Sequence, residues 1–387
     1  MRVLITSPIF PPDLGGPAVY VPSLGRFLVE RGHTVKVLAF CSQDHPTGHP
    51  FEVRAISRGP LPLRYLKAFF AVLSEAGHVD VVYVQEHLAL LHVLAARLRG
   101  KPVMIRIMVD GAWEIAHRKG WCGDDDIVTF QEKSYGWQVR LTRFLQRRWW
   151  GWCSHIISCS EFLRQILIQH HGVPPGKVQR IFNAYHGPPA DQVQQTASAA
   201  RAELGLPGDR LYVLTICRLM VWKGVDGILE AMRDLPDDVH LLVAGDGDML
   251  VPWQELARET GIAERVTFLG NVPHEKIPAF VRAADVFVLN SRYEGLSHTL
   301  LEVLHLDRPM IASSVCGNPE VVEHEHNGLL VDPHDSAALA RAIRRLLDDP
   351  KLGERFVAAS RERQAPFNRE STFAEVEAAL ERIAGER

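Results

Sequence analysis

Two carboxylates, Glu294 and Glu302, lie eight positions apart at the predicted junction of a strand and a helix. An apolar strand pattern precedes Glu294, which we therefore expect in the turn after that strand. Glu302 is expected about two turns into the following helix. The unpaired N–H groups at the start of this helix, near Ser297, His298 and Thr299, can bind a phosphate. The carboxylates can then accept hydrogen bonds from sugar hydroxyls and from a ribose, unless the segment is only a capped, solvated helix start.

A second pair of charged residues, Arg218 and Lys223, follows the apolar run Leu211–Cys217. That run is predicted to be a buried strand, so that Arg218 leaves its end and Lys223 enters the next helix. Ligands of open α/β sheets bind at the carboxyl ends of the strands. A guanidinium and an ammonium at this edge suit the oxygens of a diphosphate. Two solvated surface cations are the simpler alternative.

The ordered set of motifs resembles the family 4 retaining glycosyltransferases, which have the two-domain GT-B fold. The resemblance covers nearly the whole chain and includes a Gly15-Gly16 loop in the first half. It implies two Rossmann-like α/β domains whose parallel sheets face a central cleft, and a UDP- or GDP-linked sugar donor with no further cofactor. The other matching segments are Arg218-x4-Lys223-Gly224, Val243-Ala-Gly-Asp-Gly247, Phe268-Leu-Gly-Asn-Val272-Pro, Ala283-Ala-Asp285, Glu294-x7-Glu302, Gly317-Asn-Pro-Glu320 and Asn327-Gly-Leu-Leu-Val331.

The resemblance implies a catalytic role for Arg218, Lys223 and Glu294. The two cations, together with helix-start amides near Ser297, would stabilise charge on the departing diphosphate. Glu294 would hold hydroxyls of the transferred sugar. The implied mechanism is a front-side attack that keeps the α configuration, in which the leaving phosphate takes the proton of the acceptor hydroxyl.

The resemblance also implies contacts to the rest of the donor. Glu302 would bind the ribose, and the backbone around Asn271 and Val272 would bind the base. Gly16 would approach the donor phosphates from the first domain, because a glycine at that turn has no Cβ in the way. Asp110 follows another first-domain strand, where many relatives carry His and some carry Asp. We predict that Asp110 is catalytic and accepts from donor or acceptor hydroxyls, with a helix N-cap as the alternative.

Rival functions remain within and outside this fold. A nucleotide-sugar epimerase of the same fold is one alternative. A phosphorylase of the same fold is disfavoured, because the motif with its cofactor lysine is not found in this sequence. A dinucleotide-dependent oxidoreductase is disfavoured because Leu250 stands where the third glycine of Gly-x-Gly-x-x-Gly would fall. A non-catalytic nucleotide-sugar-binding subunit would have no need for all four charged residues of the motif set.

Composition limits the class of partner. The 387-residue chain is 47% hydrophobic and 23% charged, a composition typical of a globular protein. Its net charge of −3 argues against bulk nucleic-acid binding. Met1–Thr6 is predicted to be a strand and not a signal peptide, and no run is long enough to span a membrane. Six cysteines without a CxxC pair are typical of a cytosolic protein, so we expect a cytoplasmic enzyme, peripheral at the inner membrane face if it meets lipid.

Alternating strand and helix patterns predict two domains. We expect an acceptor-binding domain at 1–190, completed by a C-terminal helix at about 366–387, and a donor-binding domain at 191–365. The acceptor is expected to be a small molecule, a lipid-linked sugar or a glycan. The predicted strands are Val3–Thr6, Val35–Phe40, Val81–Val84, Val103–Ile107, Ile156–Cys159, Tyr212–Ile216, His240–Ala244, Val266–Leu269, Val286–Leu289 and Pro309–Ala312.

Two further features have open interpretations. The Asp-x-Asp pair of Asp246 and Asp248 is best explained as a turn, and no other cluster has metal-ligand spacing, so we expect no metal. The stretch Trp113–Trp152 holds six of the eight tryptophans, interleaved with arginines. It can be a helix that packs Leu141, Phe144, Leu145 and Trp149 inward, a contact with lipid headgroups, or a platform for a sugar acceptor.

Overall fold

The structure, a computed structural model, describes residues 1–13, 15–42, 46–57, 59–85, 89–187 and 195–386. The chain divides into two compact units, Met1–His186 with Arg369–Arg387, and Gly187–Asn368. We call them unit 1 and unit 2. The predicted boundary at residue 190 lies outside the described residues. The predicted boundary at residue 365 lies close to Asn368, where unit 2 ends.

Unit 1 is built on a seven-stranded parallel sheet with the order β3-β2-β1-β4-β5-β6-β7. Continuous burial of the central strands explains their near-unbroken apolar sequences, as expected for a parallel sheet covered on both faces. The strands are β1 (Arg2–Ser7), β2 (Thr34–Cys41), β3 (Glu52–Ser57), β4 (Val81–Val84), β5 (Val103–Ile107), β6 (His155–Ser158) and β7 (Val178–Arg180).

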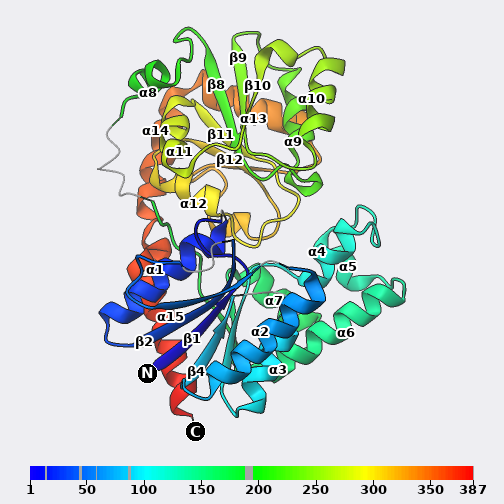
Figure 1. Cartoon of the computed structure of the whole chain (residues 1–387). Coiled ribbons are helices and arrows are strands. Elements are labelled where there is room, and N and C mark those ends of the chain that lie inside the picture. Colours follow the sequence, from blue (N-terminus) through cyan, green and yellow to red (C-terminus); the bar gives the residue numbers. More distant parts are fainter. Residues whose placement is uncertain (14, 43–45, 58, 86–88, 188–194, 387) are drawn as a thin grey trace. The chain divides into compact units, whose positions relative to one another are not determined.

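Helices lie on both faces of this sheet (Figure 1). The C-terminal helix α15 packs with α1 in the core of unit 1, where its Phe373, Val376, Leu380 and Ile383 are buried. A C-terminal helix at about 366–387 had been expected to complete this domain. The helices are α1 (Gly16–Glu30), α2 (Leu61–Ala76), α3 (Leu90–Leu98), α4 (Gly111–Arg118), α5 (Ile127–Glu132), α6 (Trp137–Trp152), α7 (Glu161–Gln169) and α15 (Arg369–Gly385), with a 3₁₀ turn η1 (Pro175–Lys177).

Unit 2 repeats the architecture with a six-stranded parallel sheet of the order β10-β9-β8-β11-β12-β13. The chain starts in the middle of the sheet, runs to one edge, and returns to continue on the other side of β8. The order therefore reverses between β8 and β11. The strands are β8 (Leu211–Ile216), β9 (Val239–Ala244), β10 (Val266–Gly270), β11 (Val286–Leu289), β12 (Met310–Ser313) and β13 (Leu329–Val331).

The core of unit 2 lies between one sheet face and the helices α9, α10 and α13, and includes Trp253 and Phe356. The helices are α8 (Ala197–Leu204), α9 (Val225–Met232), α10 (Leu250–Glu259), α11 (Ile277–Ala283), α12 (His298–His305), α13 (Ser336–Asp348) and α14 (Pro350–Glu362). The 3₁₀ turns are η3 (Val221–Lys223), η4 (Ala263–Arg265), η5 (His274–Lys276), η6 (Asn318–Glu320) and η7 (Ala365–Phe367).

The prediction of two α/β units with parallel sheets is confirmed, and all ten predicted strands are present within a residue or two of their expected ends. Three further strands, β3, β7 and β13, were not predicted. None of the six cysteines forms a disulfide. Among the described residues, no helix combines the length and the apolar character needed to cross a membrane.

Candidate active site

The sheet of unit 2 brings the two predicted charged pairs to one place. β8 and β11 are hydrogen-bonded neighbours, so the loops after them share the C-terminal edge at the point where the strand order reverses. This point is where open α/β sheets bind ligands. Lys223, which ends η3 after β8, meets Glu294, which follows β11, with 2.5 Å between Nζ and Oε1.

Close backbone contacts hold the two loops together. Gly224 adopts a left-handed φ of 63°, and a Cβ there would lie 2.1 Å from the carbonyl oxygen of Asn290. The buried Asn290 amide donates to the Gly224 oxygen (3.1 Å). Arg292 donates its backbone N–H to Trp222 and pairs with Asp226 at 2.7 Å. The motif Lys223-Gly224 therefore needs glycine because the loop after β11 lies directly against it.

The neighbouring loops are fixed in the same way. A Cβ at Gly245, which has a φ of 137°, would lie 1.8 Å from the carbonyl oxygen of Cys217. A Cβ at Gly317 would lie 2.1 Å from the carbonyl oxygen of Gly295, and the Gly317 N–H donates to the Glu294 carbonyl. Glycines at both positions let the loops after four strands form one continuous backbone surface. This surface positions Lys223 and Glu294.

The salt bridge sets the charge state of the site. Burial lowers the pKa of the Lys223 ammonium, but the charge of Glu294 and its hydrogen bond outweigh this and leave that pKa raised. Glu294 also accepts from the Ser291 hydroxyl (2.9 Å). Lys223 is therefore a cation at neutral pH. An ammonium has three donors, so the bond to Glu294 leaves two for other acceptors.

Arg218 lies exposed in the loop directly after β8. Its guanidinium has no hydrogen bond or ion pair to any residue that the structure describes. The prediction placed this cation at the strand end next to Lys223, and the structure places it two residues past the last residue of β8. Its five donors are thus available at the same sheet edge as the salt bridge.

Helix α12 presents its N-terminus beside Glu294. Ser297 is the N-cap, and its hydroxyl accepts from the Leu300 N–H at 3.3 Å. His298 and Thr299 are the first two helical residues, and both are partly exposed. Because the helix begins at His298, Glu302 lies about one turn into it, where two turns had been predicted. This shorter distance keeps both carboxylates close to the helix start.

Glu302 has a partner that the sequence did not indicate. His274, in η5, lies 2.9 Å from Oε1 of Glu302. The hydrogen bond to Glu302 and its charge raise the pKa of His274. Asn271 and Val272 stand just before η5, in the loop after β10. The structure therefore brings the predicted base-binding loop and the predicted ribose carboxylate together through His274.

Known proteins match both units. Residues 197–363 match the family described as Glycosyl transferases group 1, and residues 15–184 match the family described as Glycosyl transferase 4-like domain. The chain belongs to the group 1 glycosyltransferases. Alpha-D-kanosaminyltransferase of Streptomyces kanamyceticus is 36% identical over 208 residues, which are 52% of this chain and 53% of that protein. The chain thus spans about half the length of this relative.

Solved structures show the fold of this glycosyltransferase. Sucrose-phosphate synthase from Thermosynechococcus elongatus superposes with a TM-score of 0.82 at 22% identity, over 99% of each chain. Anabaena Alr3699/HepE, solved in complex with UDP-glucose, superposes with a TM-score of 0.77 at 21% identity, over 98% of this chain and 100% of that one. The predicted GT-B fold is confirmed.

In unit 1 of this glycosyltransferase, Gly16 is the first residue of α1 and is exposed. Gly15 before it has a φ of 147°, and a Cβ there would lie 2.5 Å from the Ile9 side chain. The pair stands at the C-terminal edge of β1, which neighbours β4 at the reversal of the strand order. This turn is the position in unit 1 that corresponds to the Lys223 turn in unit 2.

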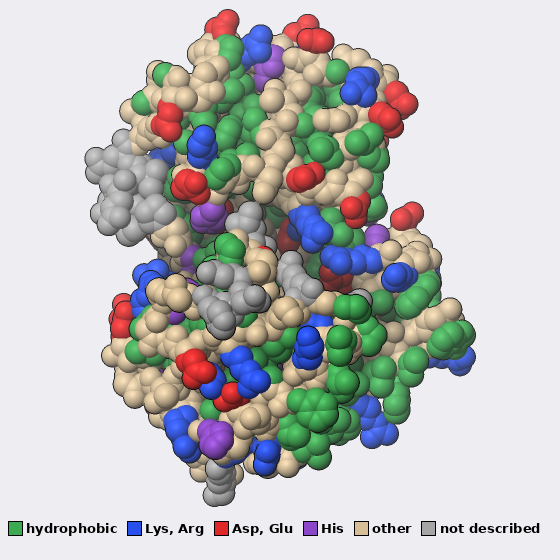
Figure 2. All heavy atoms as spheres, in the orientation of Figure 1, with side chains coloured by type: hydrophobic (Ala, Val, Ile, Leu, Met, Phe, Trp, Pro, Cys, Tyr) green, Lys and Arg blue, Asp and Glu red, His purple; other side chains and the backbone are tan. Residues whose placement is uncertain are grey.

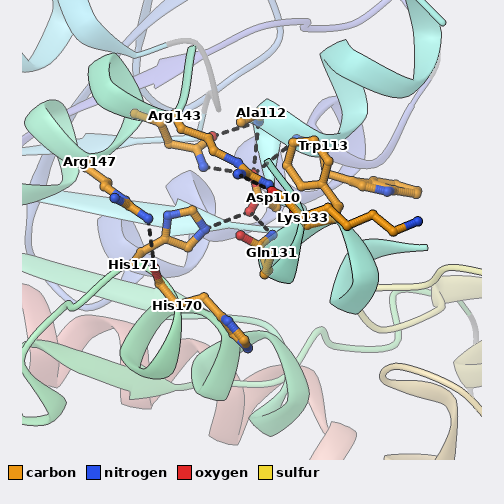
Figure 3. Close-up of polar contacts among 11 residues, drawn as sticks. Asp110, Ala112, Trp113, Gln131, Lys133, Arg143, Arg147, His170 and His171 are labelled. Atoms are coloured by element: carbon orange, nitrogen blue, oxygen red, sulfur yellow. Dashed lines mark hydrogen bonds and ion pairs between the residues drawn. The ribbon is translucent and has the colours of Figure 1, made fainter. Parts of the chain in front are cut away.

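Asp110 has the structural role that the sequence offered as its alternative. It is the N-cap of α4, and its Oδ1 accepts from the N–H groups of Ala112 and Trp113 at 2.9 and 3.2 Å. Gln146 donates to the same oxygen, while Gln131 and His171 bind Oδ2 at 2.8 and 2.7 Å (Figure 3). The carboxylate is fully buried. We therefore correct its predicted catalytic role, because every lone pair is directed to the protein interior.

The Asp246 turn follows β9, where the Asp246 carboxylate accepts from the Gly247 N–H. Among the described residues, one group of side chains has metal-ligand geometry, namely His33, Glu377 and Glu381 in unit 1. The sequence had not indicated this group, because α15 joins residues far apart in the chain. Glu377 also pairs with Arg31 at 2.7 Å, so these side chains hold α15 against the segment between α1 and β2.

Proposed function

We propose that this glycosyltransferase moves a sugar from a nucleotide-diphosphate donor to an acceptor hydroxyl, with retention of the anomeric configuration. The observation that supports this function best is the meeting of Lys223 and Glu294 at the reversal of strand order in unit 2. A cation for phosphate oxygens and a carboxylate for sugar hydroxyls stand there side by side. The start of α12 and the exposed Arg218 complete a site with the donors that a diphosphate sugar needs.

Each group has one role in the proposed reaction. As the bond from the anomeric carbon to the phosphate oxygen breaks, negative charge grows on the diphosphate, and Lys223 and Arg218 stabilise it. The acceptor oxygen forms the new bond on the same face of the sugar. The leaving phosphate takes the acceptor's proton, so atoms and charge balance without a protein base. Glu294 holds the sugar hydroxyls while this happens.

The nucleotide is proposed to lie along the loops after β10 and at α12. Glu302 would accept from the ribose hydroxyls, and the backbone at Asn271 and Val272 would contact the base. UDP is the preferred nucleotide, because HepE of the same fold was solved with UDP-glucose. No metal is assigned to the reaction, since the two cations already face the diphosphate.

The experiment that tests this function measures nucleotide diphosphate released from radiolabelled UDP- and GDP-sugars with and without candidate acceptors. A transferase releases nucleotide diphosphate only when an acceptor is present, and the product keeps the α linkage by NMR. An epimerase converts one nucleotide sugar into another without an acceptor. A non-catalytic binding subunit protects its ligand from turnover while still gaining thermal stability from it.

Glu302→Ala and Glu294→Ala are expected to differ in their kinetics. The ribose contact is made equally in the ground and transition states, so Glu302→Ala should raise the donor KM by about 10–100-fold with little change in kcat. Glu294→Ala should also lower kcat, because Glu294 touches the reacting sugar. His274→Ala is the control, since it removes the partner of Glu302 but keeps the carboxylate, so the KM should not rise. The same kinetic change in both glutamate variants would contradict this division of roles.

We also propose that unit 1 contacts an anionic membrane surface, which favours a lipid-linked acceptor. Hydrophobic side chains gather over α2, α3 and α6 (Figure 2). On α6 the exposed apolar residues are Trp137, Leu141, Phe144 and Trp152, of which Trp137 is 64% exposed. Residues at this spacing lie on one face of a helix, and here that face points to solvent. The predicted inward packing of Leu141 and Phe144 is therefore wrong, whereas Trp149 is buried as predicted.

The charge around this face supports an anionic partner. α6 and α3 contain arginines but no acidic residue, and α2 adds the exposed apolar side chains Leu63, Leu66 and Phe70 beside Lys67. Not every arginine of α6 is available. Arg143 donates to the carbonyls of Phe130 and Lys133 and stacks on Phe130, and Arg147 donates to His170. Arg140 and Arg148 are the two other arginines of α6, and both are exposed.

The double variant Arg140→Gln/Arg148→Gln is expected to weaken binding to anionic vesicles by about 30-fold, from roughly 1 kcal/mol per arginine near the surface. Co-sedimentation with phosphatidylglycerol vesicles measures this, and wild-type binding should fall as salt rises to about 0.15 M. Arg341→Gln/Arg355→Gln in unit 2 makes the same charge change and should leave binding intact. Failure of the wild type to bind these vesicles at low salt would remove the membrane proposal.

A further inference from the structure

A pocket of about 560 Å³ lies at the N-terminal edge of the sheet of unit 2, opposite the edge that carries the candidate active site. Leu211, the first residue of β8, and Pro309, directly before β12, line it from the sheet. Gly353 lines it from α14, where a Cβ would lie 2.9 Å from the Pro309 ring. Three arginines, Arg282, Arg308 and Arg361, also line this pocket, and we call it the arginine pocket.

Three acids, Asp285, Asp307 and Glu354, line the pocket beside the three arginines, but two of them pair with Arg361 and with Arg201 from outside the lining. Both oxygens of Asp307 accept from Arg361, at 3.0 and 2.8 Å. Asp285 pairs with Arg201 of α8 at 2.7 Å and also accepts from the Tyr212 N–H. Each of these two acids therefore already has an arginine partner. The remaining acid of the lining, Glu354, is exposed on α14.

Arg282 and Arg308 are the two arginines of the lining that form no ion pair. Within the described part of the chain, neither has a carboxylate oxygen at salt-bridge distance. The Nε atoms of both guanidiniums are buried and have no hydrogen-bond partner there. One terminal nitrogen of Arg308 donates to the carbonyl oxygen of Arg282 at 2.7 Å, which holds the two residues together.

The environment of Arg308 changes the pKa of its guanidinium. Burial lowers the pKa of its guanidinium to about 10. The negative charges of Asp285 and Asp307 raise this pKa, and the positive charges of Arg282 and Arg201 lower it. A buried N–H without an acceptor is costly, and both guanidiniums have one at Nε. An anion in the pocket would accept from these groups and would add negative charge beside two arginines that form no ion pair.

We propose that the arginine pocket binds the phosphoryl group of a small phosphorylated metabolite, with Arg282 and Arg308 donating to its oxygens. Guanidinium groups suit phosphate because their planar forks give two parallel hydrogen bonds. The volume lies in the range of small-molecule pockets, and Leu346, Val357 and Ala358 supply an apolar wall for the remainder of the ligand. The site is separate from the proposed transferase reaction and shares no side chain with it.

The test compares two probes on two variants by thermal unfolding. Hexose 6-phosphate and inorganic phosphate report on the arginine pocket, and UDP reports on the candidate active site. Arg308→Gln should weaken the apparent affinity for the phosphate probes about 10-fold or more, the loss expected for a charge-assisted hydrogen bond, and should leave the UDP shift unchanged. Lys223→Ala should do the reverse.

The outcomes separate this inference from the proposed function. A phosphate shift that is lost in Lys223→Ala and kept in Arg308→Gln would overturn the arginine pocket, because the probes would then bind at the active site. Absence of any phosphate or hexose phosphate shift in the wild type would overturn it as well. If Arg308→Gln does not fold, Arg282→Lys takes its place, since it keeps the charge but removes the Nε–H donor. Retention of full affinity in Arg282→Lys would contradict the assigned contacts.

Discussion

Lys223→Ala is expected to lower kcat by about 10²–10³-fold, comparable to the loss of one donor that stabilises transition-state charge. The ammonium stands at the reversal of strand order, where the proposed diphosphate accumulates charge as the sugar departs. Because that charge is larger in the transition state than in the bound donor, kcat should fall more than the donor KM rises. Steady-state kinetics with saturating acceptor measures both constants.

Controls must separate charge from structure, because Lys223 also pairs with Glu294. Lys223→Met keeps most of the side-chain stem and should lose kcat to the same extent as the alanine variant. Lys276→Ala removes an exposed lysine of the same unit and should be active. Circular dichroism and thermal unfolding establish that each variant is folded. Near-normal turnover in a folded Lys223→Met variant would show that the cation has no catalytic role.

Nine of the ten strands that the sequence predicted are largely buried, and the tenth, the partly buried edge strand β10, was found from its short apolar run. β8 and β11 read as continuous apolar runs because a central parallel strand has helices above and below it. β3, β7 and β13 lie at the edges of their sheets and are only partly buried. Their sequences therefore alternate or are too short to stand out. Edge strands of this kind are found only once the neighbouring strand is placed.

The sequence was sufficient to predict which residues form the candidate active site, but not which of them contact one another. Strand ends followed by Lys223 and Glu294 placed both at one sheet edge, yet their direct salt bridge joins residues 71 positions apart. It exists because β11 pairs with β8, a sheet order that the alternation of elements does not determine. His274 was missed for the same reason. Its position just after the Asn271-Val272 loop is a weak signal until β10 and α12 are brought together.

Asp110 shows where the same strand-end argument fails. An acid after a first-domain strand is compatible both with a catalytic carboxylate and with an N-cap. The sequence holds no signal for the decision, because Gln131, Gln146 and His171 reach the carboxylate from three separate elements. Full burial excludes direct contact with a substrate. Asp110 can influence activity only through the stability and shape of unit 1.

Asp110→Ala is accordingly expected to lower the free energy of unfolding by about 3–5 kcal/mol, as for loss of one partner from a buried charged pair. The variant removes the N-cap of α4 and leaves buried donors of Gln146 and His171 without an acceptor. Urea unfolding followed by circular dichroism measures the change. Asp126→Ala, which removes the exposed cap of α5, is the matched control and should cost only about 1 kcal/mol.

The pH dependence of the stability of Asp110→Ala tests whether the loss comes from the charge of the Asp110 carboxylate. Burial acts to raise the pKa of Asp110, but the charge of His171 and the hydrogen bonds from His171, Gln146 and Trp113 hold it well below its usual range. A carboxyl whose pKa is depressed in the folded state stabilises the protein fully above its unfolded pKa of about 3.9, and this contribution is lost as pH falls below that value. The difference in stability between wild type and Asp110→Ala should therefore be largest near neutral pH and shrink in acid. Unchanged stability together with a large loss of kcat in the folded variant would instead return Asp110 to the catalytic role that its burial argues against.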